Sequence, residues 1–365
     1  MKVYFTDLNC SYKNDVFKKI RRVTNEMSLH KKISGGALVA VKLHFGEMGN
    51  LAFLNPLYAR EIVDIVKGAG GKPYLTDTNT LYRGKRKNAP SHLENAYAHG
   101  FSPLVMGAPV YISGGLMGDT CKEIAMNGEE NEKVYSAEGI YNADFLVILS
   151  HFKFHEVAGF GGALKNAGMG CAPVRGKLAM HSFYTPYVMN SCVGCAKCVK
   201  WCHSAAISLV EKRAFIDPEK CVGCGICIGI CPDDHIRIRW SEKTGRVGKS
   251  MMEYAAGILR DFKGRAFYMN FLEKISPQCD CYPFSDNPVV EDIGILASYD
   301  PVALDAASID LVNAAAGRPC SELEGIAAGQ DKIAELYPDV KWKQQLAYAE
   351  KLGLGTRAYT LVDVR

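Results

Sequence analysis

The sequence of 365 residues has no apolar run approaching the roughly 18 residues that a membrane-spanning helix requires. Its first residues reach Asp7 too early for the hydrophobic region of a signal peptide. Hydrophobic residues make up 48% of the chain and charged residues 22%, so the composition is not that of a disordered protein. We therefore expect a globular cytoplasmic protein with no membrane partner.

The sequence also lacks a concentrated positive charge. The formal net charge is only +4, and the basic residues are dispersed, without the interleaved aromatic residues that stack on nucleobases. We expect no nucleic-acid partner. The Walker pattern and the dinucleotide-binding fingerprint are both absent, so nucleotide binding is only weakly indicated.

Cysteine, in contrast, is abundant. Fourteen cysteines in a chain without a signal peptide indicate metal or redox chemistry rather than disulfides. Eight of them form two runs of the same spacing, and the second run repeats the first at an offset of 29 residues. The runs are Cys192, Cys195, Cys198 and Cys202, then Cys221, Cys224, Cys227 and Cys231, the last followed by Pro232.

This duplication resembles the bacterial ferredoxins with two 4Fe–4S clusters, in which the fourth cysteine of each run binds the other cluster. The resemblance implies one cluster on Cys192, Cys195, Cys198 and Cys231, and another on Cys221, Cys224, Cys227 and Cys202. One departure is His203, where that family usually has proline. Two zinc sites are the alternative, but duplicated runs of four cysteines fit zinc poorly.

Around the cysteines, predicted strands and helices alternate. Residues 3–7, 38–45, 74–77, 143–149, 265–275 and 293–297 read as strands, and residues 16–27, 58–67 and a segment around Trp342 as helices. Asp300 is the expected N-cap of a further helix that begins at Pro301. The pattern predicts an α/β domain with a mainly parallel sheet and helices on both faces, formed by residues 1–187 and 241–365. A small α+β ferredoxin-like unit, residues 188–240, interrupts it; we call it the cysteine module.

Ionisable residues follow the predicted strands. Asp7, His44, Asp77 and His151 lie at strand ends, and Lys42 shares a strand face with His44. Because open parallel sheets bind ligands beyond the carboxyl ends of their strands, we expect these residues to form a small-molecule site. A structural role for a single strand histidine is the alternative.

The segment from Ser150 to Cys171 is rich in glycine and basic residues. Gly159, Gly161 and Gly162 would let backbone amides approach an anionic cofactor or substrate, with Lys165 adding charge. A tight turn into a helix, with glycines for packing alone, is the alternative. Cys279 and Cys281 are candidates for soft metal ligands or a reactive thiol pair, or have a structural role. Cys10, Cys121 and Cys320 are expected to be buried as small hydrophobic residues.

Taken together, these motifs resemble the uncharacterised iron–sulfur centre proteins, a domain of unknown function (number 362) bearing a ferredoxin insert. The resemblance covers essentially the whole chain and rests on Lys42-x-His44, Asp77 to Thr80, the glycine–lysine segment, Cys279-Asp280-Cys281, and residues 292–305.

A more distant likeness is to the nickel-pincer lactate racemases, through His155, Ala158-Gly159-Phe160, Gly161-Gly162, Lys165 and His181. It implies a general base at His155, a cofactor anchor at Lys165 and a metal ligand at His181.

Three functions follow from these features. The first is an oxidoreductase, in which two 4Fe–4S clusters, fed by a redox partner protein, pass electrons to a substrate or second centre in the α/β cleft. Lys42, His44, Asp77, His155 and Lys165 are its catalytic candidates. The second is an electron carrier without chemistry of its own. The third is a racemase-like metal enzyme, and both an additional metal on His181, Cys279 or Cys281 and a flavin are possible cofactors.

Overall fold

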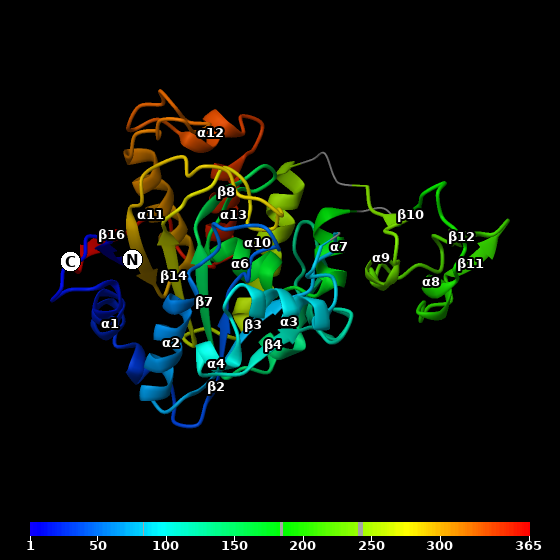
Figure 1. The fold of residues 1–365 in the computed structure, drawn as a ribbon, viewed down its shortest axis with the longest axis horizontal. Helices are drawn as coiled ribbons and strands as arrows, with labels where there is room; N and C mark the ends of the chain where they lie inside the picture. The colour runs from blue at the N-terminus through cyan, green and yellow to red at the C-terminus, as the bar shows by residue number, and fades with distance from the viewer. Residues whose placement is uncertain (83, 183–184, 240–243) are drawn as a thin grey trace.

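The computed structural model describes residues 1–82, 84–182, 185–239 and 244–365. Within them an eight-stranded sheet runs in the order β16-β1-β15-β14-β7-β2-β3-β4 (Figure 1). Its strands are β1 (Lys2–Asp7), β2 (Leu38–Lys42), β3 (Lys72–Thr78), β4 (Val110–Ser113), β7 (Phe145–His151), β14 (Ala266–Leu272), β15 (Gly294–Ser298) and β16 (Thr360–Asp363). Every neighbouring pair is parallel except the two pairs that β15 makes. The predicted α/β class with a mainly parallel sheet is confirmed.

The sheet is buried on both faces. All seven residues of β7 are buried, with Leu146 and Ile148 in one hydrophobic cluster and Val147 and Leu149 in another, because successive side chains of a strand point to opposite faces. The helices that contribute most residues to the first cluster are α6 (Ala163–Cys171), α10 (Thr244–Arg260), α11 (Pro301–Ala314) and α13 (Trp342–Lys351). Those that contribute to the second are α1 (Val16–Glu26), α2 (Pro56–Gly68), α3 (Ala89–Ala98) and α4 (Pro103–Met106).

Shorter elements complete the α/β part. They are the hairpins β5 (Cys121–Ala125) with β6 (Lys133–Ala137) and β8 (Lys153–His155) with β9 (Gly159–Gly161), and the helices α5 (Glu138–Tyr141), α7 (Val174–His181) and α12 (Lys332–Leu336). No helix in the described ranges has the length and apolar character to cross a bilayer.

Most predicted elements are present, with different ends. The Asp300 cap is confirmed, because its carboxylate accepts the amides of Val302 and Ala303 at 2.9 Å. The strand predicted over 38–45 was too long: β2 ends at Lys42. The chain then turns, since His44 Nδ1 accepts the amide of Gly46, whose φ of +75° suits glycine.

The cysteine module lies at one end of the molecule, beside α7 (Figure 1). Its elements are β10 (Tyr187–Val188), α8 (Lys197–Lys200), β11 (Ile207–Val210), β12 (Arg213–Ile216), α9 (Ile226–Ile230) and β13 (Ile236–Arg237). β10 pairs with β13 and β11 with β12, around a hydrophobic cluster that also includes Leu81, Val174 and Leu178 of the α/β part. Pairing therefore includes Tyr187, one residue before the expected start, and the expected end between residues 240 and 241 lies outside the described residues.

Three isolated cysteines were wrongly expected to be buried. Cys10 and Cys320 are exposed and Cys121 is partly exposed, whereas Cys171 is buried. Each of the three lies near a strand end or in a loop, where the neighbouring sequence gives no periodic burial signal.

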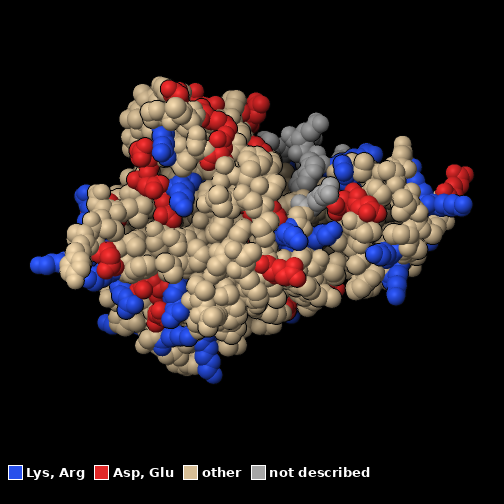
Figure 2. All heavy atoms as spheres, viewed as in Figure 1, with Lys and Arg blue, Asp and Glu red and all other residues tan. Residues whose placement is uncertain are grey.

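Figure 2 shows lysine and arginine side chains scattered over the visible face, with acidic residues between them.

Gly168 allows α6 to lie directly against α10. A Cβ added at Gly168 would lie 2.4 Å from the backbone oxygen of Met251, so Gly168→Ala is expected to lower the free energy of unfolding by about 1–3 kcal/mol. Gly35→Ala is the matched control, because no atom lies within 4 Å of its added Cβ. Anaerobic urea unfolding of both variants measures the difference, and equal stabilities would contradict the close packing.

Candidate functional site

The two cysteine runs fold into two loops of the same shape. Gly194 and Gly223 have φ of +66° and +65°, and Ala196 and Gly225 have φ of +61° and +76°, so the duplication extends to the backbone. Further along each repeat, the amide of Ala206 donates to Cys202 Sγ and that of His235 to Cys231 Sγ, both at 3.2 Å. Amide–sulfur hydrogen bonds of this kind are one way in which proteins tune iron–sulfur centres.

Each loop encloses a small cavity. One is lined by Cys192, Cys195 and Cys198 together with Cys231, and the other by Cys221, Cys224 and Cys227 together with Cys202. The fourth cysteine of each run thus faces the cavity formed by the other run. Four converging thiols are a donor set that fits an iron–sulfur cluster, in the crossed grouping that the ferredoxin resemblance implies.

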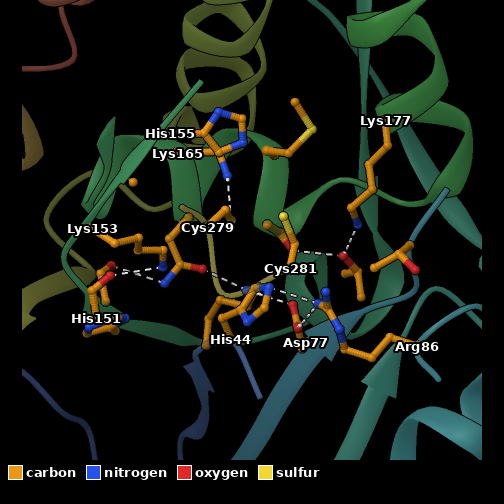
Figure 3. Close-up of a pocket in the computed structure, with 18 of the residues that line it drawn as sticks. His44, Asp77, Arg86, His151, Lys153, His155, Lys165, Lys177, Cys279 and Cys281 are labelled. Carbon is orange, nitrogen blue, oxygen red and sulfur yellow. Dashed lines mark hydrogen bonds and ion pairs between the residues drawn. The ribbon is translucent and has the colours of Figure 1, made fainter. Parts of the chain in front are cut away.

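Apart from these two cavities, a larger pocket lies at the carboxyl ends of β2, β3 and β7 (Figure 3). Nearly all the residues predicted for a cleft site line it: Lys42, His44, Asp77, His151, His155, Gly161, Gly162, Lys165, His181, Cys279 and Cys281. Asp7 does not, because its carboxylate pairs with the buried Lys19 instead. The sheet therefore brings together residues that are up to 239 positions apart in the sequence.

Asp77 is the centre of one polar network in the pocket. Lys42 Nζ lies 2.9 Å from Asp77 Oδ1 and also donates to Asn166 Oδ1 at 2.7 Å. Burial alone would raise the pKa of Asp77, but Lys42 and His92 outweigh it and hold that pKa well below the ordinary value. Burial, with the charge of Arg86 at 2.9 Å from Nε2, lowers the pKa of His44 well below the ordinary value. At neutral pH Asp77 is therefore ionised and His44 uncharged.

Asp280 is the centre of the other network. Its carboxylate lies 2.8 Å from both His151 Nδ1 and Lys153 Nζ (Figure 3). His151 Nε2 lies 2.9 Å from the carbonyl oxygen of Glu273, so both ring nitrogens face acceptors. Asp280 thus contacts both side chains and fixes the loop that carries Cys279 and Cys281.

The first two amides of α6 are occupied by a carboxylate of the protein. The amides of Ala163 and Leu164 donate to the two carboxylate oxygens of Asp305, at 2.8 and 2.9 Å. A Cβ added at Gly162 would lie 2.3 Å from Asp305 Oδ1, and one at Gly161 would lie 3.0 Å from Lys153 Cε. Close packing therefore requires glycine at both positions, and the anion-binding role of these glycines stays a prediction.

The thiol of Cys279 lies near two nitrogen-bearing side chains, those of Lys165 and His155. Lys165 Nζ is 3.6 Å from Cys279 Sγ, and His155 lies on the same side of the pocket (Figure 3). Among the described residues, His155, Cys279 and Cys281 bring three potential metal-donor atoms within 4.8 Å of one another. His181, the ligand implied by the racemase likeness, lines the pocket but is not one of the three, and burial lowers its pKa to about 3.

Sequence reasoning missed several basic residues of the pocket. Arg86 is fully buried against Glu47, and Lys177 Nζ donates to the carbonyls of Asn79 and Ala172, both at 2.8 Å. Burial lowers the pKa of Lys177 to about 7. A lysine on the otherwise apolar side of α7 was the available signal, because lysine is rarely buried without a partner.

The sequence matches the model of the family described as Domain of unknown function (DUF362) over residues 39–310. The chain belongs to this family. In this DUF362 protein the match spans most of the α/β strands and the cysteine module together.

Curated relatives of the DUF362 protein match only short segments. The chain is 50% identical over 48 residues to one component of the ion-translocating oxidoreductase complex of Methanosarcina acetivorans, covering 13% of this chain and 18% of that protein. It is 33% identical over 45 residues to the benzylsuccinate synthase activating enzyme of Thauera aromatica, covering 12% of this chain and 14% of that protein. The chain thus spans less than a fifth of either relative. With the cysteine-lined cavities, these matches support an iron–sulfur cofactor.

Among solved structures, the lactate racemase apoprotein from Thermoanaerobacterium thermosaccharolyticum is a distant likeness. The TM-score is 0.35 at 16% identity, over 67% of this chain and 44% of that chain.

Proposed function

We propose that the DUF362 protein is an oxidoreductase that transfers electrons, through two 4Fe–4S clusters in the cysteine module, to a small anionic molecule in the pocket. Cys192, Cys195, Cys198 and Cys231 would hold one cluster, and Cys221, Cys224, Cys227 and Cys202 the other. When bound, such clusters supply one-electron transfer.

The main support for this proposal is the position of α7, which contacts both the cysteine module and the pocket. Val174 and Leu178 pack against the hydrophobic cluster of the cysteine module, and a Cβ added at Gly225 would lie 2.8 Å from Val174 Cγ1. Lys177 and His181, on the same helix, line the pocket. Because α7 contacts both, a single helix separates the second cysteine loop from the pocket. A helix is about 10–12 Å across with its side chains.

The charge of the pocket favours an anionic ligand. Five basic side chains line it, Lys42, Arg86, Lys153, Lys165 and Lys177, whereas Asp77 is the one carboxylate among the described lining residues. Lys42, Lys153 and Arg86 have carboxylate partners in Asp77, Asp280 and Glu47. Lys165 and Lys177 instead contact a thiol, carbonyls and a hydroxyl, so neither is paired with a carboxylate among the described residues that line the pocket.

Cofactor analysis and reoxidation kinetics test the proposal. Anaerobically purified protein is expected to contain about eight irons and eight sulfides, as two clusters require. After reduction with dithionite, it is mixed with small organic anions that can accept electrons, and cluster absorbance is followed. We expect Lys177→Met to slow reoxidation by the active anion at least tenfold at unchanged iron content, and Lys133→Met, an exposed control, to have no effect.

Three results would contradict the proposal. Protein free of iron and sulfide would exclude the clusters altogether. Full iron content, with no anion whose reaction depends on Lys177, would favour an electron carrier that acts on another protein. Stoichiometric nickel or flavin in the same preparation would instead indicate that the pocket holds its own cofactor.

A further inference from the structure

Ion pairs and a backbone hydrogen bond fix the loop that carries Cys279 and Cys281. Asp280, between the two cysteines, is fully buried and binds His151 and Lys153. The carbonyl of Asp280 also accepts the amide of Glu47 at 2.9 Å. Both thiols therefore have fixed positions in the pocket wall, in a segment that is neither helix nor strand (Figure 3).

His155 distinguishes between a metal site and a thiol site. Its Nδ1 accepts two backbone amides, from Val157 at 3.0 Å and from Ala158 at 3.1 Å. In a neutral imidazole that accepts at Nδ1, the hydrogen lies on Nε2. A metal-binding histidine normally has the opposite arrangement, in which the nitrogen away from the metal donates its hydrogen. His155 is therefore set to donate a hydrogen bond from Nε2, and Lys165 adds a positive charge 3.6 Å from Cys279 Sγ.

These contacts give the two cysteines different roles. The hydrogen bond from Cys281, together with the charge of Lys165 and the hydrogen bond from His155, lowers the pKa of Cys279 well below its ordinary value despite burial. The same hydrogen bond, together with burial, raises the pKa of Cys281. The thiolate is the reactive form of cysteine, and Lys165 Nζ, 3.6 Å from Cys279 Sγ, is placed to stabilise it there, so Cys279 is the nucleophile and Cys281 the second thiol of the pair.

We propose that Cys279 and Cys281 form a redox-active dithiol–disulfide pair whose substrates are small disulfides that carry negative charge. The Cys279 thiolate attacks one sulfur of the substrate, the substrate S–S bond breaks, and one thiolate leaves. Cys281 then attacks Cys279 Sγ, the second substrate thiolate leaves, and the proton of Cys281 passes to a leaving thiolate. The product is a Cys279–Cys281 disulfide and a substrate reduced by two electrons.

The return step requires two electrons and one proton. Two one-electron transfers from a low-potential iron–sulfur donor would break the Cys279–Cys281 bond and restore one thiolate and one thiol. This return step rests on the proposed function, whereas formation of the pair does not. Thiol–disulfide exchange with an external dithiol can replace it in the test.

The experiment is a redox titration of the holoprotein with mixtures of reduced and oxidised dithiothreitol under anaerobic conditions. Samples are quenched in acid, alkylated and analysed by peptide mass spectrometry. We expect the peptide containing Cys279 and Cys281 to convert in a single two-electron step to a form two hydrogens lighter, while Cys10 and Cys320 remain alkylated. With an acidic disulfide such as glutathione disulfide, Cys281→Ser is expected to accumulate a mixed disulfide on Cys279.

Lys165 is a positioning residue in this scheme, and its variants separate activation from folding. At pH 7, Lys165→Met is expected to slow alkylation of Cys279 at least about tenfold and to move its pH profile upward, because one pKa unit is a tenfold change in thiolate. Lys165→Arg keeps the charge and is expected to restore most of the rate.

Two outcomes would overturn the inference, and a third separates it from the proposed function. A stoichiometric metal that is lost in Cys279→Ser would assign the pair to a metal centre. A pair that stays reduced across the titration, in protein with full iron content, would refute the disulfide while leaving the proposed function intact. Protein without clusters whose pair still titrates would refute the proposed function alone.

Discussion

Replacing Cys231 with alanine is expected to remove the same cluster as replacing Cys195, and replacing Cys202 the same cluster as replacing Cys224. The reason is that Cys231 lines the cavity of the first cysteine run and Cys202 that of the second. Each variant should retain about half of the iron, because each cluster contains four of the eight irons. Electron paramagnetic resonance of the reduced protein would identify which cluster remains.

Comparing the residual signals of the four variants tests which cysteines share a cluster. Cys231→Ala and Cys195→Ala should give the same residual signal, and Cys202→Ala and Cys224→Ala the other. Cys320→Ala is the control, since Cys320 is exposed and lies outside both cavities. If Cys231→Ala instead matched Cys224→Ala, each run would bind its own cluster, and the crossed grouping would be wrong.

The second large effect is expected at Asp280. Asp280→Asn leaves the buried Lys153 without its countercharge and removes the carboxylate that His151 contacts, and breaking a buried pair in this way typically costs about 3–5 kcal/mol. The carboxylate has a pKa lowered by His151 and Lys153 in the folded state, although burial opposes the shift. Its stabilisation is therefore complete above the ordinary aspartate pKa of about 4 and is lost as the pH falls through the folded value.

Anaerobic urea unfolding of Asp280→Asn and the parent protein at pH 7 and at pH 5 measures this contribution. The difference should be large at both pH values, since both lie above the ordinary aspartate pKa. Glu123→Gln is the matched control, because the Glu123–Lys133 pair is exposed and salt bridges of that kind contribute little. Equal losses in the two variants would show that the Asp280 network does not stabilise the fold.

Local sequence predicted the framework of the fold well. β7 reads as a continuous apolar run because both of its faces are buried, and the Asp300-Pro301 cap is confirmed because capping depends on adjacent residues. The antiparallel direction of β15 and the place of β1 between β15 and β16 were not predicted. Strand direction and order are set by tertiary packing, and the alternation of strands and helices gives only the commonest arrangement.

In the pocket, too, features set by the strands were predicted, whereas contacts between residues far apart in the sequence were not. Residues at strand ends were placed together correctly, because parallel strands share one edge. The close contact of Gly162 with Asp305 was not predicted, since Asp305 lies 143 positions away and carries no recognisable signal. Arg86 and Lys177 were missed for a related reason: their burial depends on Glu47 and on carbonyls that the sequence does not reveal. The catalytic and ligand roles given to individual pocket residues stay predictions.

The strand order also sets when the sheet can be completed during synthesis. β1 is made first, yet its partners β15 and β16 lie at residues 294–298 and 360–363. β7 likewise awaits β14, and the cysteine module is made between those two strands. Until then, both edges of β1 and one edge of β7 are unpaired in the nascent chain, and such edges are sites where β-structure joins other chains. Assembly of the sheet is thus a late event, completed only after the cysteine module has been made.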